Sequence, residues 1–374
     1  MKLSEKEKLR YSRHLILPHF GSESQEKLKK SKVLVVGTGG LGAPVLQYLT
    51  AAGIGTIGVI DFDKIDETNL QRQVLFSSED IGKAKTSVAI EKLSKQNPNV
   101  NFIEYNEKLI SKNAREIIAK YDVVADGTDN FPTRYLINDA CFLENKVNVY
   151  ASIFQFEGQV SVFNYKNGPN YRDLYPSPPP PGMVPSCAEG GVLGVLPGII
   201  GSIQALETIK VIGNIGDILS GKLLLVDTMD MSFRSINIRK DPKNPLSGEN
   251  KSIKELIDYD EFCGLKTNEM KTINVNELSI WMKEGAPFVL IDVREKYEYE
   301  TSNLGGIHIP MNEIEMQLDK IPKEGKVVMQ CRSGQRSAVA INHLMNKFGY
   351  DNLINLEGGI VDWKNKIDPE IVVA

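Results

Sequence analysis

The stretch Val33-Leu34-Val35-Val36-Gly37-Thr38-Gly39-Gly40-Leu41-Gly42 decides the fold of the N-terminal part of this chain. Its first four residues are apolar and mostly β-branched, which is typical of a strand buried in a parallel sheet. A glycine turn follows, and residues 41–52 then have the pattern of a helix that ends at Gly53. Such a turn can bind phosphate, because unpaired N–H groups and the helix dipole face the anion.

Two further strands are expected to end at the same edge of the sheet. The pattern at 55–61 predicts a second parallel strand that ends at Asp61, and 121–126 predicts a third, followed by a polar turn with Asp129 and Asn130. Ligands of open α/β sheets lie beyond the carboxyl ends of the strands, so Asp61 should face the glycine turn. Asp129 would be suited to hold a magnesium ion between phosphates.

The residues after Asp61 separate two kinds of nucleotide enzyme. Dinucleotide enzymes bind a pyrophosphate largely with main chain, whereas a triphosphate carries more charge and is stabilised by cations. Asn69, Arg72 and Lys85 supply a donor and two positive charges shortly after the second strand. ATP is therefore favoured, although an NAD-dependent oxidoreductase with the same glycine turn remains the alternative enzyme class.

Composition excludes several broad classes. The net charge of -4 comes from 44 basic and 48 acidic residues, so nothing general indicates binding to nucleic acid or to an anionic membrane. The four cysteines form no CxxC pair, which argues against a disulfide framework. Residues 1–20 lack the apolar core of a signal peptide, and the apolar stretch 192–206 is too short to cross a bilayer. We therefore expect a cytoplasmic protein.

Three other N-terminal segments carry signals. Residues 4–31 have a helical pattern that includes Arg13. Strands are expected at 147–153 and 158–164, before the proline-rich loop Tyr175-Pro176-Ser177-Pro178-Pro179-Pro180-Pro181-Gly182. Cys187 follows that loop directly. An accessible thiol there could attack an activated acyl group, but an inert loop cysteine fits the sequence equally well.

A second α/β unit follows a polar linker, with buried strands at 288–292 and 326–330. Cys331 lies where the second of these strands meets a helix, with Arg332 and Arg336 nearby, and each factor lowers the pKa of a thiol. Cysteine phosphatases place five residues between cysteine and arginine, whereas here Arg332, Ser333, Gly334 and Gln335 intervene. The smaller ring of amides favours a terminal sulfur, and thus a persulfide on Cys331.

The combined pattern resembles the ubiquitin-activating-like adenylyltransferases of the ThiF and molybdopterin-synthase adenylyltransferase group, in particular those fused to a rhodanese domain. In the first domain the resemblance rests on residues 10–17, the glycine turn, 61–73, 82–85, 128–130 and 179–206. In the second it rests on 291–295, 306–310, the Cys331 loop and 356–359. It implies an adenylyltransferase domain at 1–245 with a Rossmann-like α/β fold, a linker at 246–271 and a smaller α/β rhodanese domain at 272–374.

The resemblance also implies the ligands and partners. The residues that would bind ATP and its magnesium are Gly40, Asp61, Thr68, Asn69, Leu70, Gln71, Arg72, Lys85, Asp129 and Asn130. Arg13 would reach across a homodimer interface to the partner's phosphates. The substrate would be the C-terminal glycine of a small ubiquitin-like sulfur carrier, with Cys187 accepting the carrier or joining in sulfur transfer and Cys331 carrying sulfur from a cysteine desulfurase or thiosulfate.

One departure from the family pattern concerns zinc. Relatives typically hold zinc with two CxxC pairs, and the matching positions here are Asn170 with Asp173 and Ser247 with Asn250. This oxygen set is a poor zinc site, so we expect no structural zinc and a loop held by packing or hydrogen bonds. Molybdenum-cofactor synthesis is the favoured pathway, while thiamin, cysteine and tRNA thiolation remain open. A non-catalytic scaffold that binds the carrier is the alternative outside enzymes.

Overall fold

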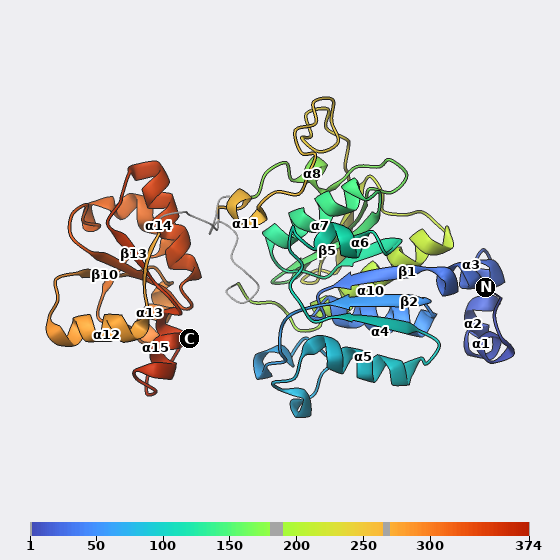
Figure 1. Ribbon diagram of the computed structural model, residues 1–374, viewed down its shortest axis with the longest axis horizontal. Helices are drawn as coiled ribbons and strands as arrows, with labels where there is room; N and C mark the ends of the chain where they lie inside the picture. The colour runs from blue at the N-terminus through green and yellow to red at the C-terminus, as the bar shows by residue number, and fades with distance from the viewer. Residues whose placement is uncertain (1, 180–189, 265–269, 374) are drawn as a thin grey trace. The chain divides into compact units, whose positions relative to one another are not determined.

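The computed structural model describes residues 2–179, 190–264 and 270–373 (Figure 1). The described residues up to Pro178 and from Gly190 to Tyr259 form one compact unit, and those from Asp260 onward form a second. Both units contain a sheet covered by helices, so the predicted α/β class is confirmed. No helix within the described part of the chain is both long and apolar enough to span a bilayer.

The first unit is built on an eight-stranded sheet in the order β3-β2-β1-β4-β5-β6-β7-β8. Strands β1 to β5 pair in parallel, and β6, β7 and β8 are added antiparallel at one side. The strands are β1 (Lys32–Val36), β2 (Thr56–Ile60), β3 (Asn101–Tyr105), β4 (Val123–Asp126), β5 (Val147–Phe154), β6 (Glu157–Phe163), β7 (Lys222–Asp227) and β8 (Ser232–Asn237). The three parallel strands expected around the glycine turn are therefore neighbours in the sheet.

Helices cover both faces of this sheet (Figure 1). The helices of this unit are α1 (Glu5–Arg10), α2 (Ser12–Leu15), α3 (Gly21–Lys30), α4 (Gly42–Ala52), α5 (Lys85–Gln96), α6 (Ala114–Ile118), α7 (Phe131–Leu143), α8 (Tyr171–Leu174) and α10 (Leu196–Gly213), with short 3-10 turns η1 (Glu67–Asn69) and η2 (Ser78–Asp80). The short helix α11 (Tyr259–Phe262) spans the boundary between the two units. Helix α10 lies close against α4, because a side chain at Gly201 would meet Pro44 at 2.5 Å. Most of the apolar stretch 192–206 thus lies in α10.

The predicted N-terminal helical region is divided into three helices. Tyr11 has non-helical dihedral angles between α1 and α2, and Pro18 and His19 lie between α2 and α3. Proline lacks the N–H that would continue a helix, and His19 has a positive φ of 65°, which a helix does not accommodate.

The second unit has a five-stranded parallel sheet in the order β11-β10-β12-β13-β9. Its elements are β9 (Lys271–Ile273), α12 (Val275–Glu284), β10 (Val289–Asp292), α13 (Lys296–Thr301), β11 (Ile307–His308), the 3-10 segment η3 (Met311–Lys320), β12 (Val327–Gln330), α14 (Gln335–Phe348), β13 (Leu353–Leu356) and α15 (Gly359–Lys366). Val327 and Met329 pack into one apolar cluster and Val328 into another. Alternate residues of β12 therefore face two cores, which explains its continuous apolar sequence.

Candidate functional site

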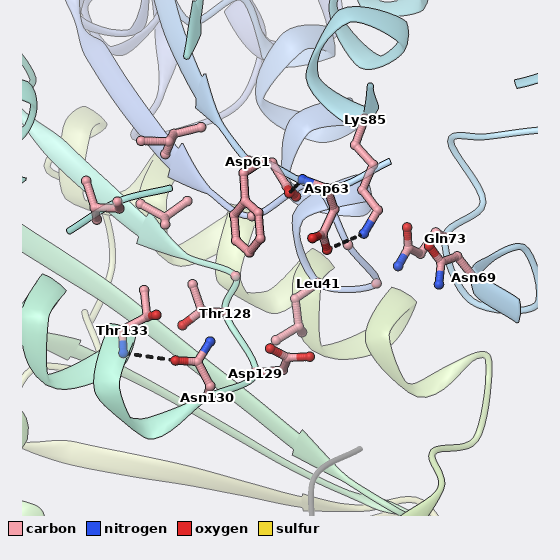
Figure 2. Close-up of a pocket in the computed structure, with 18 of the residues that line it drawn as sticks. Leu41, Asp61, Asp63, Asn69, Gln73, Lys85, Thr128, Asp129, Asn130 and Thr133 are labelled. Carbon is pink, nitrogen blue, oxygen red and sulfur yellow. Dashed lines mark hydrogen bonds and ion pairs between the residues drawn. The ribbon is translucent and has the colours of Figure 1, made fainter. Parts of the chain in front are cut away.

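A cavity of about 230 Å³ lies at the carboxyl ends of β1, β2 and β4 in the first unit (Figure 2). The predicted site residues that line it are Gly40, Asp61, Asn69, Arg72, Lys85, Asp129 and Asn130. They come from separate segments that the parallel strands bring to one edge of the sheet, as expected for an open α/β fold.

The glycine turn forms the floor of the cavity and is too tightly packed for side chains. Gly37 has a φ of 89°, and a Cβ on Gly42 would lie 1.9 Å from the Gly37 carbonyl oxygen. Helix α4 begins at Gly42, and no described side chain caps its N-terminus. The Ala43 N–H already donates to the Gly39 carbonyl, and Pro44 has no N–H. The amides left for a ligand are therefore those of the turn itself, at Gly39, Gly40 and Leu41, and the helix dipole favours an anion there.

Asp61 connects the end of β2 to the glycine turn. Its Oδ2 accepts hydrogen bonds from the backbone N–H and the hydroxyl of Thr38, at 2.8 and 2.7 Å, and its Oδ1 accepts one from the Asp63 N–H at 2.9 Å. The carboxylate that was predicted to bind ATP thus also holds the turn in place. A substitution at Asp61 would disturb both functions.

The two predicted cations are fixed on one wall. Lys85, only 5% exposed, donates from Nζ to Asp63 Oδ2 at 2.9 Å, and the Arg72 guanidinium donates to the Thr68 carbonyl at 2.9 Å. Lys85 is the first residue of α5, where the helix dipole disfavours positive charge. Asp63 compensates for this, and phosphate oxygens in the cavity would do the same.

The turn after β4 presents Asp129 and starts helix α7. Asp129 is exposed at the cavity, and the Oδ1 of Asn130 accepts a hydrogen bond from the Thr133 N–H at 3.0 Å (Figure 2). Asn130 therefore caps α7, a role beside the predicted nucleotide contact. This cap and the buried end of β4 fix the direction in which the turn projects.

Some predicted residues do not line the cavity. The Thr68 hydroxyl donates a hydrogen bond to Asp66, and Leu70 packs against the apolar core. Gln71 is exposed and does not line the cavity. Arg13 is exposed on α2. Its predicted contact with the partner's phosphates needs a second subunit, so the single chain does not test it. Cys187 lies outside the described residues.

Sequence reasoning missed several lining residues. They are Glu107, Lys108 and Leu109 after β3, Thr133 and Arg134 on α7, Ile153 on β5, and Val192. The rule that ligands lie beyond strand ends could have identified the residues after β3, since β3 pairs in parallel with β2. Arg134 had no such signal, because a helix position reveals its neighbours only in the folded chain.

The acidic residues fit magnesium only together with a nucleotide. Across the described ranges, no group of three or more His, Cys, Asp or Glu side chains could hold a metal by itself. Magnesium usually takes one or two carboxylates, and substrate phosphates and water complete its shell. Asp129 meets that requirement at the cavity, so the residues present fit the ion.

The loops that correspond to the zinc site of relatives are joined by hydrogen bonds. Asn170 donates from Nδ2 to Ser247 Oγ at 2.8 Å, and Asn244 donates from Nδ2 to Asp173 Oδ1 at 2.8 Å and to Asn170 Oδ1 at 3.2 Å. We call Asn170, Asp173, Asn244 and Ser247 the polar knot. Its oxygen atoms are already used as acceptors and no thiolate is present, so these residues do not fit zinc.

In the second unit, Cys331 follows β12 and begins a loop that leads into α14. Its Sγ accepts a hydrogen bond from the Gly334 N–H at 3.1 Å and lies 3.5 Å from the hydroxyl of Ser337, and the side chain is fully buried. The first turn of α15 supports the loop, since the Ile360 N–H donates to the Cys331 carbonyl at 3.0 Å. A Cβ on Gly359 would lie 2.3 Å from that carbonyl, so glycine is required for this contact.

The two arginines of the loop differ in their surroundings. The Arg336 guanidinium makes two hydrogen bonds to the carboxylate of Glu298, at 2.7 and 2.8 Å, and Arg332 is half-buried. Burial is the largest single effect and raises the pKa of Glu298. The hydrogen bonds from Arg336 and from the Glu295 backbone, together with the charges of Arg336 and Arg294, outweigh it and lower the pKa. The positive charge that was expected to act on Cys331 through Arg336 is thus largely balanced by Glu298. Ser333 and Gln335 are exposed.

Comparison with known proteins agrees with this geometry. The model of the ThiF family matches residues 11–246, and that of the rhodanese-like domain matches 274–366. A probable adenylyltransferase/sulfurtransferase MoeZ of Mycobacterium tuberculosis is 45% identical over 99% of this chain and 96% of its own. The adenylyltransferase and sulfurtransferase MOCS3 of Drosophila yakuba is 42% identical over 100% of this chain and 86% of its own.

Relatives of the first unit alone are also found. A sulfur carrier protein adenylyltransferase of Thermus thermophilus is 50% identical over 71% of this chain and all of its own. Among solved structures, Escherichia coli MccB with ATP has a TM-score of 0.57 and 25% identity over 64% of this chain and 74% of its own. We conclude that this chain belongs to the ThiF family, with a rhodanese-like domain at its C-terminal side, and that it is an adenylyltransferase joined to a sulfurtransferase.

Proposed function

We propose that the first unit adenylates the C-terminal glycine of a small ubiquitin-like sulfur carrier with ATP, and that the second unit supplies sulfur from a persulfide on Cys331. The observation that supports this proposal is the composition of the cavity. It gathers backbone amides, the cations Arg72 and Lys85 and the acid Asp129 at one sheet edge. A triphosphate needs this combination of groups, whereas a dinucleotide does not.

In the first half-reaction, a carboxylate oxygen of the carrier terminus attacks the α-phosphorus of ATP. The bond from that phosphorus to the oxygen bridging to the β-phosphorus breaks, and pyrophosphate leaves with the electron pair. A carboxylate needs no general base, so the protein contributes position and charge. Arg72 and Lys85 stabilise the leaving pyrophosphate, and Asp129 would hold a magnesium ion, which supplies charge neutralisation when bound.

In the second half-reaction, the terminal sulfur of the Cys331 persulfide attacks the acyl carbon and AMP leaves. The product is an acyl disulfide between the carrier and Cys331. A thiol reductant then supplies two electrons to the sulfur–sulfur bond, which releases the carrier thiocarboxylate and the Cys331 thiolate. Transfer of the acyl group to Cys187 before the sulfur step is a variant of the same chemistry.

The remaining features of the proposal concern context. We infer a cytoplasmic homodimer in which Arg13 of each subunit reaches the partner's phosphates, a role consistent with the exposed Leu9, Ile16 and Leu17 around it. The sulfur donor is a cysteine desulfurase or thiosulfate, and no nucleic acid or membrane takes part. Molybdenum-cofactor synthesis is the favoured pathway, and thiamin, cysteine and tRNA thiolation use the same chemistry.

The domain limits and the metal content belong to the proposal as well. The adenylyltransferase domain spans 1–245, the linker 246–271 and the rhodanese domain 272–374. The filled hydrogen bonds of the polar knot support the absence of structural zinc. Metal analysis of the purified chain should therefore find no stoichiometric zinc, and a full equivalent of zinc would contradict this part.

Exchange of labelled pyrophosphate into ATP, measured with a carrier of the molybdopterin-synthase type, tests the first half-reaction. Asp129→Ala and Arg72→Ala should each slow exchange by roughly 100-fold or more, the cost of losing one stabilising group in a transition state. Arg115→Ala is the control, because Arg115 lies on α6 outside the cavity and pairs with Glu144. Exchange that persists in both site variants would exclude this cavity.

Two alternatives make different predictions. An NAD-dependent oxidoreductase would be stabilised against heat by NAD, whereas we expect stabilisation by ATP with magnesium. A non-catalytic scaffold would bind the carrier, but Cys331 would not accept sulfur. Mass spectrometry after incubation with thiosulfate should detect one added sulfur on wild type and none on Cys331→Ser.

A further inference from the structure

Three hydrogen bonds restrain Thr128, the residue before Asp129. Its N–H and its hydroxyl both donate to Asp126 Oδ1, at 3.0 and 2.6 Å, and its carbonyl accepts a hydrogen bond from Arg134 Nη2 at 3.2 Å. The polar atoms of Thr128 are thus taken up by two charged side chains. A residue restrained in this way leaves its neighbour little freedom in direction.

The two holding side chains are themselves buried. Asp126 is fully buried at the end of β4, and Arg134, on α7, is 7% exposed and lines the cavity. The Arg134 guanidinium carbon lies 5.6 and 5.8 Å from the ring centres of Phe131 and Tyr150, so aromatic rings restrict it. The carbonyl of Asp126 accepts from Gln204 on α10 at 2.8 Å, which ties the strand end to the helix beneath.

Burial of these two polar side chains has a cost that their contacts only partly offset. Asp126 Oδ2 and Arg134 Nε have no hydrogen-bond partner in the part of the chain that the structure describes. Buried polar atoms without a partner are destabilising. What both side chains do hold is Thr128, in the turn that carries Asp129.

We propose that Asp126 and Arg134 are positioning residues that fix Thr128 and thereby aim the Asp129 carboxylate at the metal–nucleotide complex. This inference rests on the proposed function, because it assumes that Asp129 acts through magnesium on bound ATP. It predicts that loosening Thr128 weakens binding of the magnesium complex. Binding of the nucleotide without metal should change little.

The test measures calorimetric binding of α,β-methylene-ATP to the full chain, once with magnesium and once with EDTA. Thr128→Val removes the hydroxyl bond to Asp126 at nearly constant shape, and Thr128→Ser keeps it. Arg134→Gln removes the guanidinium, and Thr208→Val is the control, because Thr208 is buried on α10 and bonds only the Gln204 carbonyl among the contacts described.

In magnesium, Thr128→Val and Arg134→Gln should raise Kd by about 10-fold or more, the usual effect of removing a group that orients a metal ligand. In EDTA their Kd should stay within about 3-fold of wild type, and Thr128→Ser should bind as wild type does. An equal loss in both media, or no loss for Thr128→Val, would overturn the inference.

Failure of the proposed function would look different. Wild type would then show no magnesium-dependent binding, and Asp129→Asn would not alter the magnesium titration. That result overturns both proposals together. If wild type and Asp129→Asn behave as expected while Thr128→Val binds normally, only the positioning role is wrong.

Discussion

Replacing Asn244 by alanine should destabilise the first unit alone. Asn244 is 1% exposed and connects the two loops of the polar knot. Its Nδ2 donates to Asp173 Oδ1 and Asn170 Oδ1, and its Oδ1 accepts from the backbone N–H groups of Leu246 and Ser247, at 2.9 and 3.2 Å. Alanine removes all four hydrogen bonds and leaves buried partners behind.

The size of the effect follows from these four contacts. The bond to the Asp173 carboxylate contributes roughly 1.5–3 kcal/mol, and the three neutral bonds about 0.5–1.5 kcal/mol each. Two of the neutral bonds are long, and contributions within one network do not add fully, so the expected loss is about 3–5 kcal/mol. For a unit of this size that corresponds to a fall in Tm of roughly 10 °C.

The two units can be followed separately in the intact chain. Both tryptophans, Trp281 and Trp363, lie in the second unit, so tryptophan emission reports its unfolding. Far-UV circular dichroism reports both transitions. Asn244→Ala should lower the Tm of the first unit, the transition that tryptophan emission does not report. The matched variant Asn352→Ala loses hydrogen bonds to the Pro322 and Gly325 carbonyls and should lower the Tm of the second unit.

A chelator completes the experiment. We propose that the knot holds no metal, so prolonged treatment with EDTA should leave both transitions of wild type unchanged. Two results would refute the reasoning: a change in Tm of less than about 2 °C for Asn244→Ala, below the shift expected for 1 kcal/mol, or a clear loss of stability on chelation. The second would mean that a metal holds the loops.

Two other predictions concern single contacts. The lowered pKa of Glu298 means that its pairing with Arg336 stabilises the fold above the ordinary pKa of a glutamate, and that this stabilisation is lost as pH falls through the folded value. Glu298→Gln should therefore cost about 1–3 kcal/mol near pH 7 and reduce the fall in tryptophan-detected Tm that wild type shows on acidification. The same fall in Tm for variant and wild type would count against the pair. Gly42→Ala places a Cβ 1.9 Å from the Gly37 carbonyl oxygen, so this variant should show no calorimetric binding of α,β-methylene-ATP. In the control Gly198→Ala the new Cβ meets nothing within 4 Å, and this variant should bind the nucleotide normally. Equal binding by both variants would show that the turn is not the phosphate site.

Much of the fold could be predicted because the strands are continuous apolar runs. Val33 to Val36 forms a buried parallel strand since both faces of the sheet are covered by helices, and the continuous apolar run indicates this. The site acids were predictable for a related reason. Asp61 directly follows β2, and strand ends of a parallel sheet converge on one edge.

Contacts between distant side chains were beyond sequence reasoning. Arg336 pairs with Glu298, 38 residues earlier, so its charge is balanced in a way that the loop sequence does not reveal. Asn244 was not singled out, although it connects the knot, because its partners in the other loop, Asn170 and Asp173, lie over 70 residues away. Arg134 was missed for the same reason. Spacing indicates which residues share a strand end, but not which side chains bond across the fold.

Intact-mass analysis of the carrier tests the central claim most directly. A molybdopterin-synthase-type carrier is incubated with the enzyme, ATP, magnesium, thiosulfate and a thiol reductant. The account predicts that its terminal carboxylate gains one sulfur in place of one oxygen, only with ATP. Asp129→Ala should leave the carrier unchanged, and Cys331→Ser should stop at the adenylate. Sulfur gain without ATP, or an unchanged rate in Cys331→Ser, would contradict the account.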